Sequence, residues 1–259
     1  MKHIFNAKNF NLIAAAISLI VFVPLIMLVF SFMKSFEERQ EKVGFIILGD
    51  IHVAGWNESH YKGIKAACEN FGVKLLVRDK VKENSGQCPI AIKDLVQNGA
   101  GMIFLASYSY SIEVQNLVGD YPSTAFATNS AEVHARNMTA YFVRMYQARY
   151  LAGALAGMKT KSNVIGYVAA MSNTEVNRGI NAFTLGVLRT NPNAKVVVMW
   201  TGSWQDEETE AAHAQRLIEE AGADVLTYHQ DENATAQVAE KFGVDFIAYN
   251  EILSGYSEH

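Results

Sequence analysis

Apolar and polar positions alternate in a regular way along the chain after residue 42. Short apolar runs of strand length are each followed by a turn and then by an amphipathic stretch at helical spacing. The apolar runs are continuous rather than alternating in polarity, which is typical of parallel strands buried on both faces. The pattern therefore predicts an α/β fold in which helices cover parallel sheets.

The predicted strands fall into two successive groups. The first group is Val43–Gly49, Val73–Val77, Met102–Ala106 and Thr124–Thr128, and the second is Val164–Ala169, Lys195–Trp200, Val225–His229 and Phe246–Tyr249. Between the groups, the spacing predicts one long helix from Met138 to Met158, whose glycine and alanine residues suit close helix packing. Two such groups joined by a hinge form two lobes with a cleft between them.

The first part of the chain has a different pattern. No charged residue occurs from Asn9 to Met33. A helix needs about 20 apolar residues to cross a bilayer, whereas a cleaved signal peptide has a shorter apolar core and a small-residue cleavage site. We therefore predict a membrane anchor at residues 9–33, after a cytoplasmic tail at 1–8 and before a linker at 34–42. Basic residues flank the span on both sides and do not decide its orientation. A buried soluble helix is the alternative.

Composition excludes several classes of function. The formal net charge is −4, which argues against the broad basic surface that binding of nucleic acid requires. The chain has no phosphate-binding glycine loop, no H-E-x-x-H and no G-x-S-x-G. Cys68 and Cys88 lack zinc-site spacing, and they are either a disulfide or two buried thiols. The expected order of helices and strands favours two thiols. No enzyme, metal or cofactor is predicted.

Ligands of parallel sheets bind beyond the carboxyl ends of the strands, so the residues that follow each strand are the candidates. Trp56 follows the first strand, and Trp204 follows a strand of the second group. Two such rings can enclose a planar base, and stacking contributes about 1–3 kcal/mol per base. Asp231 could accept hydrogen bonds from ring N–H groups or ribose hydroxyls. Two plainer interpretations stay open: Trp56 packs against its own helix, and Asp206 caps one.

Several motifs resemble a known family. They are Gly166-Tyr167-Val168-Ala169-Ala170, the run from Glu175 to Gly186, Trp200–Asp206, Gly55-Trp56-Asn57 and Tyr146–Gly153. These motifs are similar to those of the basic membrane protein (Bmp/PnrA-like) family, over about Lys42 to Asn250. The resemblance implies a periplasmic-binding-protein type I fold with lobes at residues 43–136 and 137–259. It also implies binding of a purine or nucleoside and its delivery to an ABC importer.

The same resemblance suggests site residues. Trp56 stands where many members carry a phenylalanine that stacks on the base, and Asn57 matches the neighbouring asparagine. Trp204 falls at a second aromatic position. The other candidates lie at or near the ends of strands that face the cleft: Ser107, Asn129, Asp206, Asp231 and Asn250.

Two departures from the family keep other functions open. Importer-linked members are typically secreted or lipid-anchored, whereas this chain has a predicted membrane span. Members also continue for tens of residues beyond the position of Asn250, so we expect a truncated, incomplete second lobe. The expected function is a membrane-anchored binding protein whose main domain lies outside the cell membrane, with an ABC permease as partner. The first alternative is the input domain of a membrane-bound signalling protein, with a signalling module as partner. A nucleoside-processing enzyme is the second.

Overall fold

The computed structural model describes residues 23–24, 26–27, 41–53, 55–130 and 133–249. Residues 1–41 and 42–259 form two separate units. The predicted cytoplasmic tail, most of the predicted anchor and most of the linker lie outside the described residues, and the four described residues of the anchor are helical. Within the described part of the chain, no helix combines the length and apolar character needed to cross a bilayer.

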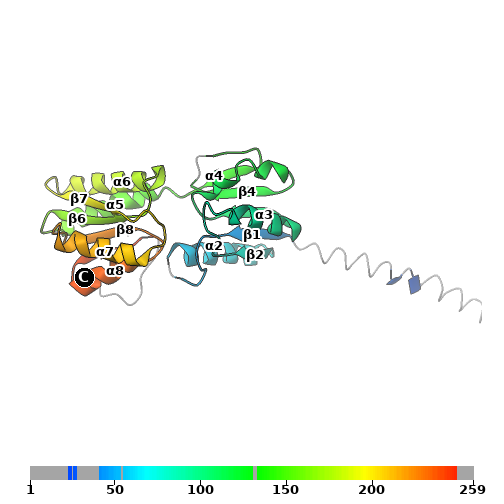
Figure 1. Cartoon of the computed structure of the whole chain (residues 1–259), viewed down its shortest axis with the longest axis horizontal. Helices are drawn as coiled ribbons and strands as arrows, with labels where there is room; N and C mark the ends of the chain where they lie inside the picture. Colours follow the sequence, from blue (N-terminus) through cyan, green and yellow to red (C-terminus); the bar gives the residue numbers. More distant parts are fainter. Residues whose placement is uncertain (1–22, 25, 28–40, 54, 131–132, 250–259) are drawn as a thin grey trace, which may run out of the picture. The chain divides into compact units, whose positions relative to one another are not determined.

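The sheet of the first lobe has five parallel strands in the order β2-β1-β3-β4-β5 (Figure 1). The strands are β1 (Lys42–Ile46), β2 (Lys74–Arg78), β3 (Ala100–Leu105), β4 (Ala125–Asn129) and β5 (Met138–Tyr141). The connecting helices are α2 (Trp56–Asn70), α3 (Gln87–Gln97), α4 (Tyr110–Val114) and the short η1 (Val118–Asp120). The predicted α/β fold with parallel strands is confirmed for this lobe.

The two faces of this sheet are covered unequally. Ile46, Ile103 and Leu105 pack against α3 and α4 on one face. Phe45 and Ile47 point to the other face, where they pack against α2. One face therefore carries two helices, and the other carries α2 alone among the described elements.

The prediction of a single helix from Met138 was wrong at its start. Residues 138–141 pair in parallel with β4, and helix α5 begins at Met145. The side-chain amide of Asn137 is hydrogen-bonded to backbone carbonyl groups of the preceding loop, which fixes the chain as it enters β5. Thr139 and Tyr141 also favour an extended conformation. The first sheet therefore extends past residue 136, where the first lobe was predicted to end.

The second lobe has four parallel strands in the order β7-β6-β8-β9. The strands are β6 (Val164–Ala169), β7 (Lys195–Trp200), β8 (Val225–His229) and β9 (Asp245–Ile247). Helices α5 (Met145–Lys159) and α6 (Thr174–Thr190) cover one face, and α7 (Glu207–Glu219) and α8 (Ala234–Phe242) cover the other (Figure 1). That the second lobe is incomplete stays a prediction. Among the described elements, the thinly covered sheet face belongs to the first lobe.

Helices α5 and α6 pack unusually closely, as the small residues of α5 predict. A Cβ atom built on Gly153 would overlap the backbone carbonyl oxygen of Phe183. A Cβ atom on Gly186 would likewise overlap the backbone carbonyl of Tyr150, and one on Gly157 would lie 2.6 Å from the carbonyl oxygen of Val187. Glycine is therefore required at these positions by the approach of the two backbones.

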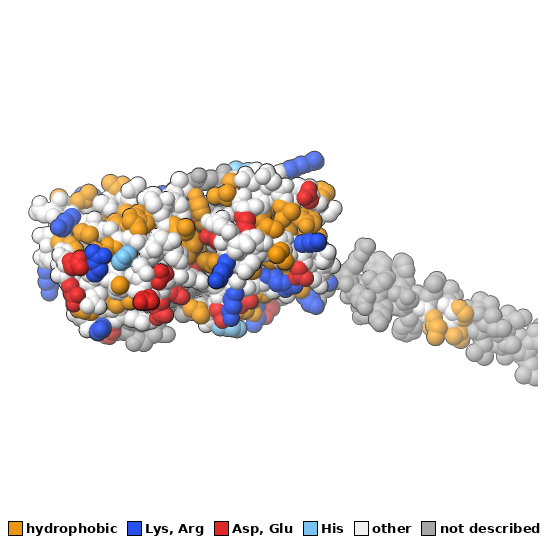
Figure 2. Space-filling view, viewed as in Figure 1, with side chains coloured by type: hydrophobic (Ala, Val, Ile, Leu, Met, Phe, Trp, Pro, Cys, Tyr) orange, Lys and Arg blue, Asp and Glu red, His pale blue; other side chains and the backbone are white. Residues whose placement is uncertain are grey.

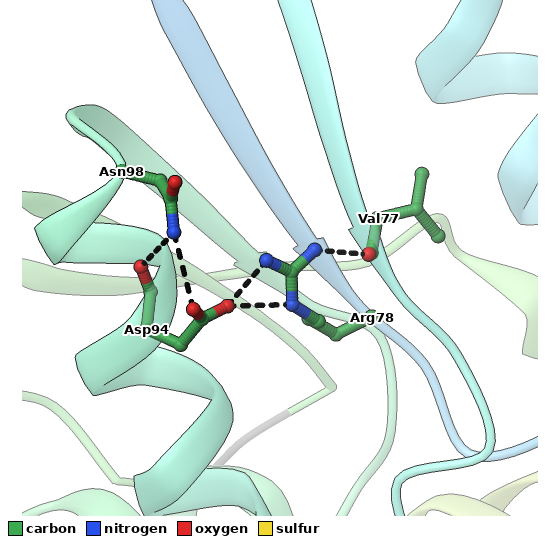
Figure 3. A network of polar contacts seen from close by, with 4 residues as sticks. All are labelled: Val77, Arg78, Asp94 and Asn98. Atoms are coloured by element: carbon green, nitrogen blue, oxygen red, sulfur yellow. Dashed lines mark hydrogen bonds and ion pairs between the residues drawn. The ribbon is translucent and has the colours of Figure 1, made fainter.

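Polar side chains also hold helices in place. Nε of Arg78, the last residue of β2, donates to Oδ2 of Asp94 on α3 at 2.7 Å, and Nη2 contacts the same oxygen (Figure 3). Asn98 ends α3 and donates to the backbone and side-chain oxygens of Asp94. Exposed ion pairs contribute about 0–1 kcal/mol. The network therefore orients α3 on the edge strand more than it stabilises the lobe.

Cys68 on α2 and Cys88 on α3 are both buried free thiols. Their helices lie on opposite faces of the first sheet, which confirms the prediction of two thiols. On the face drawn in Figure 2, basic and acidic side chains are interspersed and do not gather into one basic region.

A buried carboxyl group joins α7 to α8. Oε1 of Glu210 accepts hydrogen bonds from the backbone N–H and the hydroxyl of Thr235, at 2.9 and 2.7 Å. Its Oε2 atom is buried without a partner. Burial raises the pKa of Glu210 to about 7, and the hydrogen bonds from Thr235 oppose this shift.

The raised pKa of Glu210 predicts a pH-dependent stability. Between pH 4.5 and about 7 the folded chain holds a proton that the unfolded chain has released, so the free energy of unfolding falls as pH rises through this range. The shift corresponds to about 3 kcal/mol. Glu210→Gln should remove this part of the slope, as measured by urea unfolding from pH 4.5 to 8. An unchanged slope in the variant would contradict the assignment.

Candidate ligand-binding site

A small cavity is lined by residues of both lobes. In each sheet the strand order reverses beside the first strand, between β1 and β3 and between β6 and β8. Parallel sheets bind ligands at such switch points, beyond the carboxyl ends of the strands. The residues that line the cavity come from these ends or from the segments that follow them: Trp56, Ser107, Tyr108, Asn129, Glu175, Trp204, His229, Asp231 and Tyr249.

Five of the candidate site residues therefore come together: Trp56, Ser107, Asn129, Trp204 and Asp231. Asn57 and Asp206 do not line the cavity, and Asn250 lies outside the described residues. That the five bind a ligand stays a prediction.

Trp56 forms the wall of the first lobe and is held from two sides. Its Nε1 donates to the carbonyl oxygen of Ala106 at 3.0 Å, and its ring centre lies 3.9 Å from that of His60. Burial lowers the pKa of His60 to about 4, so this imidazole is neutral at neutral pH and supports the indole as an apolar group. The ring of Trp56 is thus positioned before any ligand arrives.

Asn57 braces the loop that carries Trp56. Its Oδ1 accepts from the backbone N–H of Gly49 at 3.1 Å, and its side chain is fully buried. A Cβ atom on Gly49 would overlap the side-chain amides of Asn57 and Gln205. The two lobes therefore touch at this loop, and Asn57 acts by shaping it.

Trp204 and Asp231 form the wall of the second lobe. The backbone N–H of Asp231 donates to the carbonyl oxygen of Trp204 at 3.0 Å, which ties the loops after β7 and β8 together. Nε1 of Trp204 is buried without a partner. Next to it, Oδ1 of Asp206 accepts from the backbone N–H of Thr209 at 3.0 Å. The interpretation of Asp206 as a helix cap, at the start of α7, is confirmed.

Four residues of the lining were not among the candidates: Tyr108, Glu175, His229 and Tyr249. Nε2 of His229 lies 2.8 Å from the hydroxyl of Tyr249 and 3.7 Å from Oε1 of Glu175. Tyr108, His229 and Tyr249 end or follow predicted strands. The rule that ligands bind beyond the carboxyl ends of parallel strands, which we call the strand-end rule, could therefore have found them. Glu175 lies in the first turn of α6, where an acidic residue is common for reasons of helix stability alone.

Arg149 supports this side of the cavity through hydrogen bonds and a ring contact. Its Nη2 donates to the hydroxyl of Tyr167 and to the carbonyl oxygen of Tyr228, both at 2.5 Å. The guanidinium carbon lies 4.6 Å from the ring centre of Tyr249. Burial lowers the pKa of His229. The hydrogen bond and charge of Glu175 oppose this shift, and the charge of Arg149 adds to it. His229 is therefore neutral at neutral pH.

Acidic groups dominate the electrostatics of the cavity. Burial, followed by the neighbouring carboxylate of Glu83, raises the pKa of Asp231 well above its ordinary value. Glu83 accepts hydrogen bonds from the hydroxyl of Ser107 and the backbone N–H of Ser109. No lysine or arginine is among the described residues that line the cavity. A phosphate group would find no cation there.

Several polar atoms in the wall have no partner of their own. They are Oδ1 of Asn129, Oε2 of Glu175, Nε1 of Trp204 and Nδ1 of His229. Buried polar atoms are normally hydrogen-bonded, so this set fits a ligand that offers both donors and acceptors. The described residues hold no group of three or more histidine, cysteine or acidic side chains arranged to bind a metal ion.

Two parallel-sheet lobes with a polar, aromatic cavity between them define the class of bilobed ligand-binding proteins. Residues 40–254 match the family of PnrA-like substrate-binding proteins of ABC transporters, and the chain belongs to that family. The resemblance carried by the motifs is thereby confirmed. The description of this family names substrate binding for ABC transporters.

Curated relatives differ in what their names say they bind. The chain is 34% identical over 209 residues to a purine-binding protein of Brucella abortus, covering 80% of this chain and 59% of that protein. It is 32% identical over 215 residues to a putative ABC transporter glucose-binding protein of Haloferax volcanii, covering 83% and 54%. The chain thus spans less than two thirds of the length of either relative.

The fold is shared with solved structures. A transcriptional activator of the comK gene from Bacillus halodurans superimposes with a TM-score of 0.65 at 22% identity, covering 80% of this chain and 70% of that one. At this level of identity the likeness shows the fold alone.

Proposed function

We propose that this protein binds a purine or a purine nucleoside in the cavity between its lobes and presents it to an ABC importer. One observation carries the proposal. Two tryptophan side chains, Trp56 from one lobe and Trp204 from the other, line the same cavity beside unpartnered polar atoms. The name of the Brucella relative supports a purine as ligand.

The chemistry of the wall suits both parts of a nucleoside. A base between the indoles gains stacking on each face, at about 1–3 kcal/mol per base. Nε1 of Trp204 is a donor only, and beside a stacked base it would find an acceptor in a ribose hydroxyl. The free oxygens of Glu175 and Asn129 would accept from the exocyclic amine or from ribose hydroxyls. Burial raises the pKa of Asp231, which favours the protonated carboxyl group, and this form can donate as well as accept.

A hexose is the competing ligand. The Haloferax relative is named for glucose, and aromatic rings beside carboxylates also suit a sugar with many hydroxyls. A hexose can pack its C–H faces against an indole, whereas a purine offers a flat π-face on each side. The pair of tryptophans therefore suits both ligands, and the higher identity to the purine-binding relative is what favours the purine.

Calorimetry of the full chain with adenosine, guanosine, adenine, adenosine monophosphate and glucose tests the proposal. We expect binding of nucleosides or the free base, and at least tenfold weaker binding of the monophosphate because no basic side chain lines the described cavity. Glucose binding without purine binding would overturn the ligand assignment.

We also propose that residues 9–33 anchor the protein in the cell membrane with its main domain outside. The absence of charge from Asn9 to Met33 supports this. The chain should stay in the membrane pellet after an alkaline carbonate wash, and protease added to spheroplasts should digest the main domain. Release by carbonate would argue against the anchor, and protection from protease would reverse the orientation.

A further inference from the structure

A second hollow lies beside the ligand cavity and shares one wall with it. Glu175, His229 and Tyr249 line both spaces. The remaining lining comes from the segment that leads from β5 into α5 and from the first turns of α5 and α6. We call this space the arginine hollow, because three arginines line it: Arg144, Arg149 and Arg178.

The charge of Arg149 is buried without a counter-ion. The residue is 3% exposed, and no described carboxylate forms an ion pair with it. Its hydrogen bonds go to neutral groups, which are the hydroxyls of Thr227 and Tyr167 and the carbonyl oxygen of Tyr228. Its Nε atom has no partner. Because buried charges in proteins are normally paired, an anion in the arginine hollow would be favoured.

Arg144 and Arg178 add positive charge where the arginine hollow meets solvent. Both are exposed, and neither forms an ion pair with a described carboxylate. Arg144 directly precedes α5, whose N-terminus no described side chain caps and whose first turn holds no acidic residue. Guanidinium groups and helix N-termini both bind oxyanions. The arginine hollow is therefore a region of positive potential built from independent sources.

The wall shared with the ligand cavity adds groups that distinguish one anion from another. Oε2 of Glu175 and Nδ1 of His229 are buried without a partner. This Nδ1 lies 3.6 Å from the position of a Cβ atom built on Gly179, which also lines the arginine hollow. An ionised carboxylate accepts hydrogen bonds but cannot donate them. Glu175 therefore suits an oxyanion that keeps an O–H group and disfavours one that has none.

We propose that the arginine hollow binds inorganic phosphate, with its charged oxygens toward the guanidinium groups and an O–H group donating to Glu175. Inorganic phosphate keeps an O–H group at neutral pH, whereas sulfate does not. The planar guanidinium group also matches the geometry of a phosphate. No basic residue is among the described residues that line the ligand cavity, so the phosphate binds as a separate molecule. This second ligand site goes beyond the proposed function.

Calorimetry of the full chain with sodium phosphate and with sodium sulfate, at constant ionic strength and without purine, tests the proposal. We expect saturable binding of phosphate, at least tenfold tighter than that of sulfate. Arg144→Gln and Arg178→Gln should each weaken phosphate binding at least fivefold. Arg189→Gln is the matched control, because Arg189 is exposed on the same helix as Arg178 but does not line the arginine hollow. It removes the same charge and should change phosphate binding less than twofold.

Glu175→Gln tests how the anion is selected. An amide group can donate as well as accept, so sulfate should no longer be disfavoured. The preference for phosphate over sulfate should shrink at least fivefold in this variant. A changed ratio of two affinities does not follow from partial unfolding, and circular dichroism checks that each variant is folded.

Four results would overturn the proposal. They are no saturable binding of phosphate, sulfate binding as tight as that of phosphate, equal loss in the Arg178 and Arg189 variants, and tighter binding of adenosine monophosphate than of adenosine that Arg178→Gln abolishes. The third would show a general effect of net charge, and the fourth would place the phosphate of a nucleotide in the arginine hollow. The phosphate titrations contain no purine, so failure of the anion site is distinguishable from failure of the ligand assignment.

Discussion

Gly153→Val is expected to lower the free energy of unfolding of the second lobe by about 3 kcal/mol, at the upper end of overpacking effects. The added side chain would meet the backbone carbonyl of Phe183, which cannot rotate away as a side chain could. Helices α5 and α6 would have to separate. Arg149 lies one turn earlier on α5, so its hydrogen bond to Tyr228 would be disturbed as well. Urea unfolding followed by circular dichroism measures the effect.

Gly63→Ala is the control for this experiment. Gly63 also lies within a helix, α2, but a Cβ atom there meets no heavy atom within 4 Å. Alanine is favoured over glycine in a helix by about 1 kcal/mol, so this variant should be slightly more stable than the native chain. Native-like stability of Gly153→Val would show that the two helices can move apart, contrary to the packing described.

Trp204→Ala and Trp56→Ala are each expected to weaken nucleoside binding by about 10- to 100-fold, the loss that follows from 1–3 kcal/mol of stacking per base. Trp204 should show the larger effect, since its unpartnered Nε1 is also lost as a donor to the ligand. Calorimetry gives the affinities. Thermal unfolding of each variant in the absence of ligand separates lost binding from lost stability.

Trp200→Ala is the matched control. This third tryptophan ends the edge strand β7, is 37% exposed and does not line the cavity. Its replacement should leave nucleoside affinity within twofold of the native value. If all three substitutions had the same effect, or if the first two had none, the stacked-base site would be wrong while the fold would stand.

Hydrophobic pattern predicted most strands because buried parallel strands are continuously apolar. It failed at β5, whose sequence Met-Thr-Ala-Tyr is short and not strongly apolar, and which is followed almost at once by residues at helical spacing. What makes it a strand is pairing with β4 and the anchoring of Asn137 by the loop before it. These are tertiary contacts that a local pattern cannot contain.

The candidate site shows the same difference between what a local pattern predicts and what tertiary contacts decide. The strand-end rule placed Trp56 and Trp204 correctly at the cavity, because position along the chain decides which loops meet there. The rule does not distinguish a side chain that lines the cavity from one that stabilises a loop, as Asn57 does through its hydrogen bond with Gly49. Glu175 could not be predicted as a site residue, because its place in the cavity depends on how closely α6 approaches His229 in the folded chain. Local sequence spacing does not contain this information.

The enclosure of the cavity by both lobes has a consequence for rates. Tyr108 of the first lobe and Thr174 of the second lie 3.3 Å apart at their hydroxyl groups, beside the cavity wall. A molecule in contact with both lobes would lose the contacts of one of them when the lobes part, and hinge motions of this kind occur on microsecond to millisecond timescales. Differences among related ligands should therefore be expressed in residence time more than in speed of capture. A partner protein that separates the lobes would determine when the ligand is released.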